Sequence, residues 1–401
     1  MTAIRSDLDQ SLMDDYGLTD LDAFRASHKP FHWYVEFNSV LANGGFDVIV
    51  GNPPYVEYKT VKGEYSIRGF ATEDCGDLYG YVMERSTYIQ RSSGRFGMIV
   101  PVSIVSTDKF DSVRKLLLRD RKSWVASFAE RPSKLFEGVE KRLTTWIRGS
   151  STSTEVYISH YRRWLSEERE FLMATQSYVR GSDAPRLLGS SIPKIETDYE
   201  SAILRRLSRE NRLKVYFKKT SSHVVYYTRK LRYFVQFFDF VPKITDTKGG
   251  EIPPSELKEI YLPSDDLRYI AIAVLNSGLF FWFMTAHSDV RNLNKREIEE
   301  FPCSIDRISP DVARQLIELG HAVTADFQDN SRVLSNNYGK YGVLNIQSFQ
   351  PRLSKPIIDE IDRVLARHYG FTEAELDFII HYDIKYRMGR DAESEDDNGD
   401  E

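Results

Sequence analysis

The sequence has few cysteines and no long apolar run. Among its 401 residues only Cys75 and Cys303 are cysteines, too few and too far apart for a disulfide framework or a cysteine-based zinc site. No stretch approaches the length that a membrane span requires, and the first residues lack the apolar core of a signal peptide. We therefore expect a cytoplasmic protein without membrane segments and without a metal site.

Positive and negative charges nearly balance over the whole chain, but they are unevenly distributed along it. The net charge is −5, and the segment 391–401 contributes seven acidic residues, so the remainder carries +2. Between Arg205 and Lys243 there are eleven Lys or Arg and nine aromatic residues, against the two acids Glu210 and Asp239. Cations neutralise phosphates and aromatic rings stack on bases, which favours contact with nucleic acid. A solvated basic face over an aromatic core remains the alternative. The acidic tail is predicted to be disordered.

The first part of the chain alternates apolar strand-like and helical segments. Buried strands are expected at Phe46–Val50, Phe96–Val100, Trp124–Phe128 and Leu143–Ile147. Helices are expected at residues 77–90 and after Thr107, which is a suitable N-cap residue. Strands that alternate with helices predict a largely parallel α/β sheet.

The pattern weakens after the first sheet, and a boundary is expected near residue 185. Four units are predicted: 1–185, 186–350, 351–390 and the tail 391–401. The second unit contains an apolar run that predicts one long helix near residues 267–286. In the third, two helices are expected, and Thr372 and Glu375 have the spacing of a capping box. The expected fold is a partial Rossmann-like α/β sheet, a mixed α+β domain and C-terminal helices.

The tetrapeptide Asn52-Pro53-Pro54-Tyr55 directly follows the first expected strand. Ligands bind at the carboxyl ends of strands in open parallel sheets. Two prolines stiffen this loop, so the Pro53 carbonyl and the Asn52 side-chain oxygen form two fixed acceptors beside the Tyr55 ring. Two acceptors suit a planar amine such as that of adenine, because accepting both hydrogens localises the nitrogen lone pair for attack on a methyl group. An ordinary turn is the simpler alternative, but the position after a buried strand favours the functional interpretation.

The segment FDVIVGNPPYVEY resembles motif IV of the amino-methylating DNA methyltransferases. The wider resemblance is to the gamma-type adenine-specific enzymes, as in Type IIG restriction–modification proteins. It is carried by KPFHWYVEFNSVLANGGFDVIVGNPPY, GDLYGYVMERSTYIQRSSGRFGMIVPVSIVS, LFEGVEKRLTTWI, LNSGLFFWFMTAHSDVRNLNKREIEEFP and IDEIDRVLARHYGFTEAELDFIIHYDIKYR. The resemblance implies methyl transfer from S-adenosylmethionine to a flipped adenine in double-stranded DNA. It also implies a restriction–modification or phage-defence system.

The resemblance assigns roles to individual residues. Catalytic roles fall to Asn52, Pro53, Pro54 and Tyr55, while Tyr55 and Phe136 would stack on the target base. Glu36, Phe37 and Asn52 would lie at the cofactor. Residues 186–350 would form the target-recognition domain. Its expected DNA contacts are Lys218, Lys219, Arg229, Lys230, Arg232, Arg291, Lys295 and Arg296. Simpler interpretations are a helix-surface charge for Glu36 and a core position for Phe136.

The sequence departs from the family pattern before Asn52. Only 51 residues precede it, and they contain no strand followed by the Gly-rich turn that binds S-adenosylmethionine in this family. Three explanations are open: a second polypeptide carries the cofactor-binding half, the chain is a truncated remnant, or the true start lies upstream. No nuclease motif with paired acids and a lysine is evident. Two other functions stay open: a non-catalytic DNA-recognition subunit, and a protein-amide methyltransferase that shares the tetrapeptide.

Overall fold

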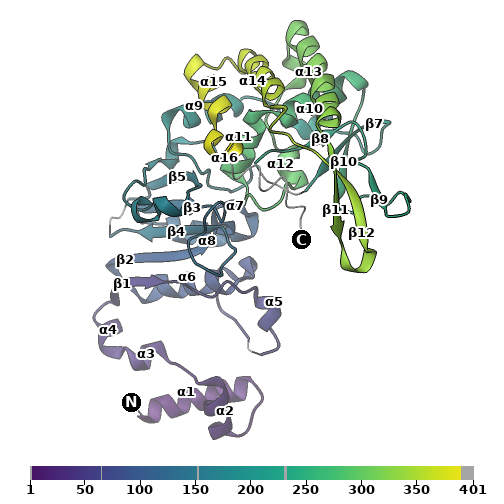
Figure 1. Ribbon diagram of the computed structural model, residues 1–401. Helices are drawn as coiled ribbons and strands as arrows, with labels where there is room; N and C mark the ends of the chain where they lie inside the picture. The colour runs from purple at the N-terminus through teal and green to yellow at the C-terminus, as the bar shows by residue number, and fades with distance from the viewer. Residues whose placement is uncertain (1, 65, 151–152, 230–232, 390–401) are drawn as a thin grey trace.

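The computed structural model describes residues 2–64, 66–150, 153–229 and 233–389. It is a mixed α/β fold with a six-stranded sheet, two three-stranded sheets and helices toward the C-terminus. Figure 1 shows the N-terminal helices at one end, the six-stranded sheet in the middle, and the later helices and smaller sheets at the other end. The acidic tail 391–401 lies outside the described residues.

Four helices precede the first strand. They are α1 (Thr2–Asp15), α2 (Leu21–His28), α3 (Trp33–Glu36) and α4 (Asn38–Ala42). The carboxylate of Asp9 on α1 joins the first three, because it accepts a hydrogen bond from Arg25 Nε of α2 at 2.7 Å and pairs with His32 Nε2, at the start of α3, at 2.8 Å. The segment before the first strand is therefore largely helical.

The central sheet is mixed, so the expectation of a largely parallel sheet is wrong. Its strands are β1 (Phe46–Gly51), β2 (Gln90–Pro101), β3 (Ser123–Phe128), β4 (Leu143–Arg148), β5 (Val156–Arg162) and β6 (Val179–Arg180). Their order is β1-β2-β4-β3-β5-β6. Only β1 with β2 and β3 with β5 are parallel. The fully described connection 129–142 contains no helix, so the chain returns from β3 as the antiparallel β4 rather than by a crossover.

Helices cover one face of this sheet. They are α5 (Tyr58–Val61), α6 (Leu78–Ile89), α7 (Ser103–Ser106) and α8 (Asp111–Leu118). The side chains of Phe96, Met98 and Val100 point from β2 into the core that α6 and α8 close. The helix expected at 77–90 is confirmed. Within the described segment 66–150, Thr107 makes no capping hydrogen bond, and a short 3₁₀ turn precedes α8.

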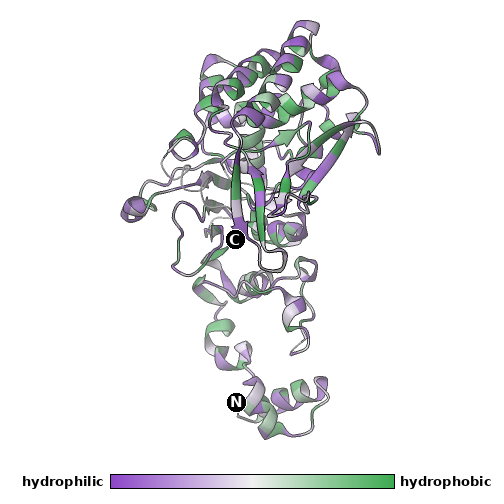
Figure 2. Ribbon diagram, turned by 45° about the vertical axis from the view of Figure 1, so that its right-hand side comes forward, coloured by the Kyte–Doolittle hydropathy of each residue, from purple (hydrophilic) through white to green (hydrophobic). Residues whose placement is uncertain are grey.

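The second half builds two small sheets around a buried helical pair. One sheet contains β7 (His223–Thr228), β8 (Phe237–Phe238) and β10 (Leu257–Leu262), and the other β9 (Ile244–Asp246), β11 (Arg332–Asn337) and β12 (Val343–Ser348). The helices are α9 (Asp198–Leu207), α10 (Asp265–Asn276), α11 (Gly278–His287), α12 (Lys295–Glu299) and α13 (Pro310–Asp329). Figure 2 shows hydrophobic residues gathered inside this end of the molecule, where α11 is buried along its whole length.

The single helix expected near 267–286 is wrong, because α10 and α11 meet at 61°. Ser277 caps α11 by accepting a hydrogen bond from Phe280 N, and the Asp362 carboxylate accepts from Gly278 N and Leu279 N. Both groups satisfy amides of a new helix start. In the described ranges no single helix is long and apolar enough to cross a membrane, and α10 with α11 is the one bent pair that passes by length and composition.

The last described segment forms three helices rather than the expected two. They are α14 (Lys355–Tyr369), α15 (Glu373–His381) and the short α16 (Ile384–Arg387). The predicted capping box of α15 is confirmed, with Thr372 Oγ1 accepting from Glu375 N and the Glu375 carboxylate accepting from Thr372 N. Arg163 near the end of β5 forms an ion pair with Asp383, which ties these helices to the central sheet.

Candidate active site

The Asn52 loop emerges from the carboxyl end of β1. This strand pairs in parallel with β2, and Gly51 lies opposite Met98. A Cβ atom at Gly51 would come within 2.8 Å of Met98 Sδ, so glycine permits the close approach of the two strands. Pro53 is buried, whereas Asn52 and Pro54 are exposed. The loop is thus anchored by its first proline and presents the Asn52 amide to solvent.

The phenol of Tyr55 holds the Asn52 side chain. Its hydroxyl lies 2.5 Å from Asn52 Oδ1, to which it donates, and 3.1 Å from the Ile99 carbonyl oxygen, an alternative acceptor. Burial raises the pKa of Tyr55 to about 12, so the phenol remains a donor at neutral pH. The sequence brings these residues within four positions, and the fold brings them into direct contact.

Tyr79 supports the Tyr55 ring and was missed by the sequence analysis. The two rings meet edge to face, with centroids 6.5 Å apart at 88°. Tyr79 stands at the start of α6, stacks on Phe110 at 5.0 Å, and shares a 2.8 Å hydrogen bond with Ser103 Oγ. A signal was present in the sequence, since a tyrosine on a helix face that is otherwise apolar needs a buried partner for its hydroxyl.

Phe136, the second expected stacking residue, lies in the connection 129–142 and is half-buried. The same connection contains Lys141. Together with the stronger effect of Lys59, the charge of Lys141 lowers the pKa of Glu57, which follows the Asn52 loop. Lys141 therefore lies near this end of the sheet. Among the described side chains no ring contact joins Phe136 to Tyr55. The stacking role of Phe136 stays a prediction.

The two residues expected at the cofactor lie away from Asn52. Glu36 forms an ion pair with Arg5 of α1 at 2.8 Å. The Phe37 ring stacks on Trp33 at 5.5 Å and meets the edge of Phe46 at 5.1 Å. Phe46 begins β1 and Asn52 follows its end, which separates them by roughly 20 Å at about 3.3 Å per residue. The structure does not bring this pair together with the Asn52 loop.

The basic residues expected to contact DNA fall into different environments. Lys218 and Lys219 are exposed, and Lys218 N donates to the Tyr261 carbonyl. Arg229 donates to Asn294 Oδ1 at 3.1 Å, which joins the end of β7 to the segment 291–296. The other two cations of this stretch, Lys230 and Arg232, lie outside the described residues.

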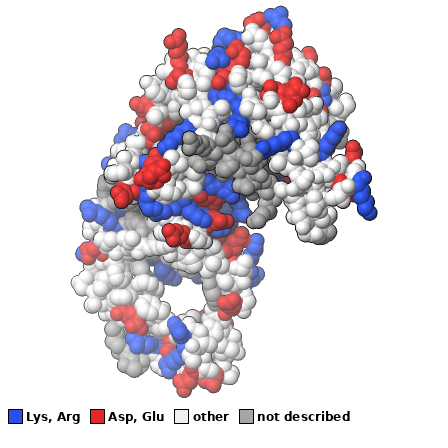
Figure 3. All heavy atoms as spheres, viewed as in Figure 1, with Lys and Arg blue, Asp and Glu red and all other residues white. Residues whose placement is uncertain are grey.

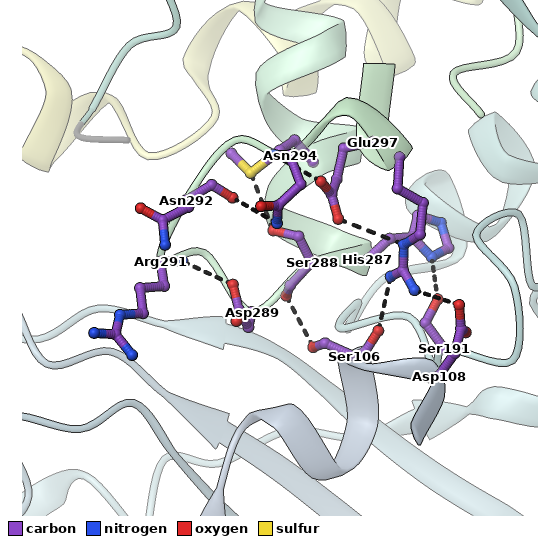
Figure 4. A network of polar contacts seen from close by, with 12 residues as sticks. Ser106, Asp108, Ser191, His287, Ser288, Asp289, Arg291, Asn292, Asn294 and Glu297 are labelled. Carbon is purple, nitrogen blue, oxygen red and sulfur yellow. Dashed lines mark hydrogen bonds and ion pairs between the residues drawn. The ribbon is translucent and has the colours of Figure 1, made fainter. Parts of the chain in front are cut away.

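Figure 4 shows the polar network around residues 287–297, with Arg291 pointing away from the other labelled side chains. Arg291 is exposed, and Lys295 pairs with Glu299 at 3.3 Å on the surface. Arg296 instead contacts Asp108 Oδ2 at 2.6 Å and the Ser106 carbonyl at 2.9 Å. Arg296 therefore links the start of α12 to the central sheet region.

Metal ligands are not gathered anywhere in the described ranges, where no group of three or more His, Cys, Asp or Glu could hold an ion. The described chemistry of the site consists of neutral acceptors, a protonated phenol and aromatic rings. Such a set orients a neutral polar group and holds a flat ring, and it offers no general base at the Asn52 loop.

The N-terminal part of the chain is similar in sequence to known restriction–modification methyltransferases. Residues 3–132 match the family model of the Eco57I restriction-modification methylase. A protein of Methanocaldococcus jannaschii named "Putative type II restriction enzyme and methyltransferase" is 30% identical over 89 residues. The match covers 22% of this chain and 8% of that protein.

Solved structures resemble the chain more distantly. The Type IIL restriction-modification enzyme MmeI in complex with DNA aligns with a TM-score of 0.42 at 11% identity, over 85% of this chain and 57% of that one. A nuclease-deletion mutant of the Type ISP enzyme LlaGI, bound to a DNA substrate mimic, aligns with a TM-score of 0.40 at 10% identity, over 84% and 48%. The chain spans about half the length of these structures and far less of the curated relative.

Proposed function

We propose that this chain is the catalytic and target-recognition part of a site-specific DNA adenine methyltransferase. It would act on the exocyclic amine of an adenine flipped out of double-stranded DNA, within a restriction–modification or phage-defence system. The observation that carries the proposal is the exposed Asn52 amide at the carboxyl end of β1, beside the buried Pro53. This loop lies inside the residues that match the methylase family model.

The chemistry of the loop follows from its acceptors. Asn52 Oδ1 has two lone pairs, of which one receives the Tyr55 hydroxyl and the other remains for the amine. The Pro53 carbonyl would accept the second amine hydrogen. Both hydrogen bonds pull electron density onto the nitrogen and make it a better nucleophile toward a methyl group. The Tyr55 ring, braced by Tyr79, would hold the base by its face.

S-adenosylmethionine is the proposed methyl donor and would supply an electrophilic methyl group. The described residues do not by themselves form its pocket, because β1 has no strand on its outer side and Glu36 is already paired with Arg5. Asn52 would contribute one wall, and the proposed contribution of Phe37 requires a shift toward the loop. We propose that a second polypeptide completes the pocket.

The remaining units take their proposed roles from position and charge. Residues 1–185 would form the partial catalytic domain, 186–350 the target-recognition domain and 351–390 a helical support. Among the described cations, the exposed Lys218, Lys219 and Arg291 are the best placed for DNA phosphates.

The proposed function is tested by deleting the gene for this protein in the native host and restoring it as wild type or as a variant. N6-methyladenine in genomic DNA is measured by mass spectrometry after digestion and mapped by sequencing. Deletion should remove the mark at one sequence, wild-type chain should restore it, and Asn52→Ala should not. Asn330→Ala, at the distant end of α13, is the control and should restore the mark fully. Restoration by Asn52→Ala would reject the catalytic role.

The alternatives give different results in the same strains. If the chain is a non-catalytic recognition subunit, genomic DNA should be methylated equally in the strains that carry Asn52→Ala and wild type, provided that the variant still binds DNA. A protein-amide methyltransferase predicts unchanged DNA and a loss of methylated glutamine or asparagine in protein digests. Each outcome separates one alternative from the proposed function.

A further inference from the structure

The backbone is strained at Val290, in the loop Ser288–Asn294 that follows α11. The φ angle of Val290 is 57°, in the left-handed region. A β-branched residue rarely adopts this conformation, because its side chain crowds the neighbouring backbone. Glycine or asparagine would tolerate it better. Strained residues persist where the surrounding structure holds them, and they gather at binding and catalytic sites.

The contacts of the Val290 side chain explain why a valine stands at this position. The side chain is buried against Ala129, which follows β3, and against Tyr161 near the end of β5. Glycine or asparagine would relax the backbone but would lose this apolar contact. The loop is therefore fastened to the central sheet even though its backbone is strained.

Three other segments hold the two ends of the loop. The carbonyl of Ser288 accepts hydrogen bonds from Ser106 Oγ at 2.9 Å and from Lys194 Nζ at 2.6 Å. At the other end, Leu293 N donates to the Arg229 carbonyl at 2.8 Å. The loop is thus bound to the end of α7, to the segment before α9 and to the end of β7, which fixes it to both halves of the molecule.

Two side chains of this loop point outward. Figure 4 shows the Arg291 guanidinium and the Asn292 amide directed away from the network that holds the loop. Arg291 is exposed and Asn292 is half-buried. Asp289 accepts from the Arg291 backbone N–H, and the Asn292 backbone carbonyl accepts from Asn294 Nδ2. In the part of the chain that the structure describes, neither outward group has a hydrogen-bond or ion-pair partner of its own.

The loop stands at the same edge of the central sheet as Asn52. Strands β1, β2, β3 and β5 run in one direction, and β4 runs against them. The ends of β3 and β5, where Val290 packs, therefore lie at the edge from which the Asn52 loop emerges. Three inter-strand spacings separate β1 from β3, or about 14 Å at about 4.8 Å each. The DNA major groove is about 12 Å wide, so one duplex can reach both places.

A cation and an amide held side by side suit double-stranded DNA. The guanidinium binds phosphate, and the amide can hydrogen-bond N6 and N7 of an adenine in the major groove. Figure 3 shows Lys and Arg side chains gathered where the central sheet meets the later helices, as a polyanion requires. Phosphate contacts fix the register of the duplex, whereas base contacts specify its sequence. Rigid support matters most for the base contact, because it tolerates little misplacement.

We propose that Asn292 reads an adenine of the recognition site through the major groove and that Arg291 binds a neighbouring phosphate. The inference rests on the proposed function and deepens it, because this loop would help to select the sequence that is methylated. The adenine that Asn292 reads is not the methylated one, since Asn52 would hold that base about 14 Å away along the sheet edge.

Initial methylation rates on a panel of duplexes test the reading role. Each duplex carries the recognition site mapped in the host with one base pair replaced, and the enzyme is the active preparation purified from the host. Asn292→Ala should lose at least about tenfold of the wild-type discrimination at one A·T pair and keep it elsewhere. The control Asn330→Ala should discriminate like wild type. Unchanged discrimination at every position, or an equal loss at all positions, would overturn the reading role.

The salt dependence of DNA binding separates Arg291 from Asn292. Arg291→Gln should weaken binding to all duplexes alike. The slope of the logarithm of the binding constant against the logarithm of the salt concentration should fall in magnitude by about one. Asn292→Ala should keep the wild-type slope, as should the control Arg314→Gln, which removes an exposed charge on α13. A relaxed sequence preference in Arg291→Gln at an unchanged slope would overturn the assignment of the two roles.

Val290→Gly tests the anchoring of the loop. Glycine accepts the left-handed backbone but loses the contact with Ala129 and Tyr161. We expect reduced discrimination at the same A·T pair as in Asn292→Ala, with the salt dependence kept. Wild-type discrimination in this variant would overturn the positioning role of Val290.

The reading loop and the methyltransferase fail separately. Selective DNA binding that loses one A·T pair in Asn292→Ala, without methylation by wild type, would preserve the reading loop and reject the methyltransferase. Methylation at one sequence by wild type, with unchanged discrimination in Asn292→Ala, would preserve the methyltransferase and overturn the reading loop.

Discussion

The hydroxyl of Tyr55 donates a hydrogen bond to Asn52 Oδ1 across 2.5 Å. The contact fixes which side of the amide faces outward, because the oxygen is the only acceptor of that side chain. It also means that an incoming amine shares Oδ1 with a donor that the protein already supplies. Tyr55 therefore has two separable functions in the proposed site, one through its hydroxyl and one through its ring.

Substitution of Tyr55 should separate these functions. Tyr55→Phe keeps the ring and removes the donor, so we expect methyl transfer by the active complex to fall about 5- to 10-fold, the equivalent of about 1 kcal/mol for one hydrogen bond. Tyr55→Ala also removes base stacking, which is worth about 1–3 kcal/mol. Methyl transfer should therefore fall further in this variant, mainly through a higher KM for DNA. Initial rates at varied DNA concentration measure both. Equal rates for the two variants would contradict the role of the ring.

The ion pair of Arg296 with Asp108 should couple α12 to the central sheet. The two side chains are 31% and 52% exposed, so screening limits the coupling free energy to about 0.5–1 kcal/mol. Urea unfolding of Arg296→Ala, Asp108→Ala and the double variant measures it. The surface pair Arg314 with Asp311, more exposed at 67% and 64%, is the matched control and should couple less.

The same variant tests whether Arg296 also contacts DNA. If its guanidinium serves only Asp108 and the Ser106 carbonyl, Arg296→Ala should bind DNA with an unchanged salt dependence. The slope of the logarithm of the DNA-binding constant against the logarithm of the salt concentration (the salt slope) would instead fall in magnitude by about one if Arg296 contacts a phosphate, as the sequence analysis predicts. Fluorescence anisotropy between low and moderate salt distinguishes the two results.

Removal of exposed charges should weaken DNA binding without changing sequence preference. The exposed Lys218 and Lys219 lie next to each other before β7, and each phosphate contact that is lost lowers the salt slope by about one. Lys218→Gln combined with Lys219→Gln should therefore reduce the slope by about two. Lys115→Gln on α8, where Lys115 is 77% exposed and paired with Asp111, is the control. An unchanged slope in the double variant would remove this pair from the interface.

Local signals in the sequence predict the elements around the site and fail for their assembly. The apolar run 46–50 and the capping box of Thr372 and Glu375 specify a strand and a helix start through neighbours in the chain, and both are confirmed. The break between α10 and α11 depends on Asp362, which lies more than eighty positions away, and no local pattern reveals it. Likewise, period and composition describe β1 as an interior strand but cannot reveal that its outer side is open.

The candidate site shows the same division. Asn52, Pro53 and Tyr55 are adjacent in sequence, and their mutual geometry follows from a short stiff loop. The bracing of Tyr55 by Tyr79 and by the Ile99 carbonyl requires the pairing of β1 with β2 and the position of α6. The roles of Glu36 and Phe37 at the cofactor came from the resemblance and stay predictions, and the structure places α3 at the opposite end of β1 from Asn52.

Stability should rise with pH between about 7 and 9 because of Lys194. Its ammonium is fully buried against the carbonyls of Ala286 and Ser288, and burial lowers its pKa from 10.5 to about 7, although Asp289 partly opposes this. In this window the unfolded chain binds more protons at Lys194 than the folded chain. The free energy of unfolding should therefore increase by up to about 1.4 kcal/mol per pH unit. Urea unfolding at several pH values measures the slope.

Lys194→Met isolates this contribution. Both carbonyls keep another donor in the variant, since the Lys194 backbone N–H donates to Ala286 O and Ser106 Oγ donates to Ser288 O. The variant should thus fold and should lose the positive slope below pH 9. Above pH 9 the comparison becomes less direct, because burial raises the pKa of Cys75 from 9.0 to about 11. The folded chain then binds more protons at Cys75 than the unfolded chain, so this thiol lowers the free energy of unfolding as pH rises. The same slope in Lys194→Met and wild type would mean that Lys194 stays charged in the fold.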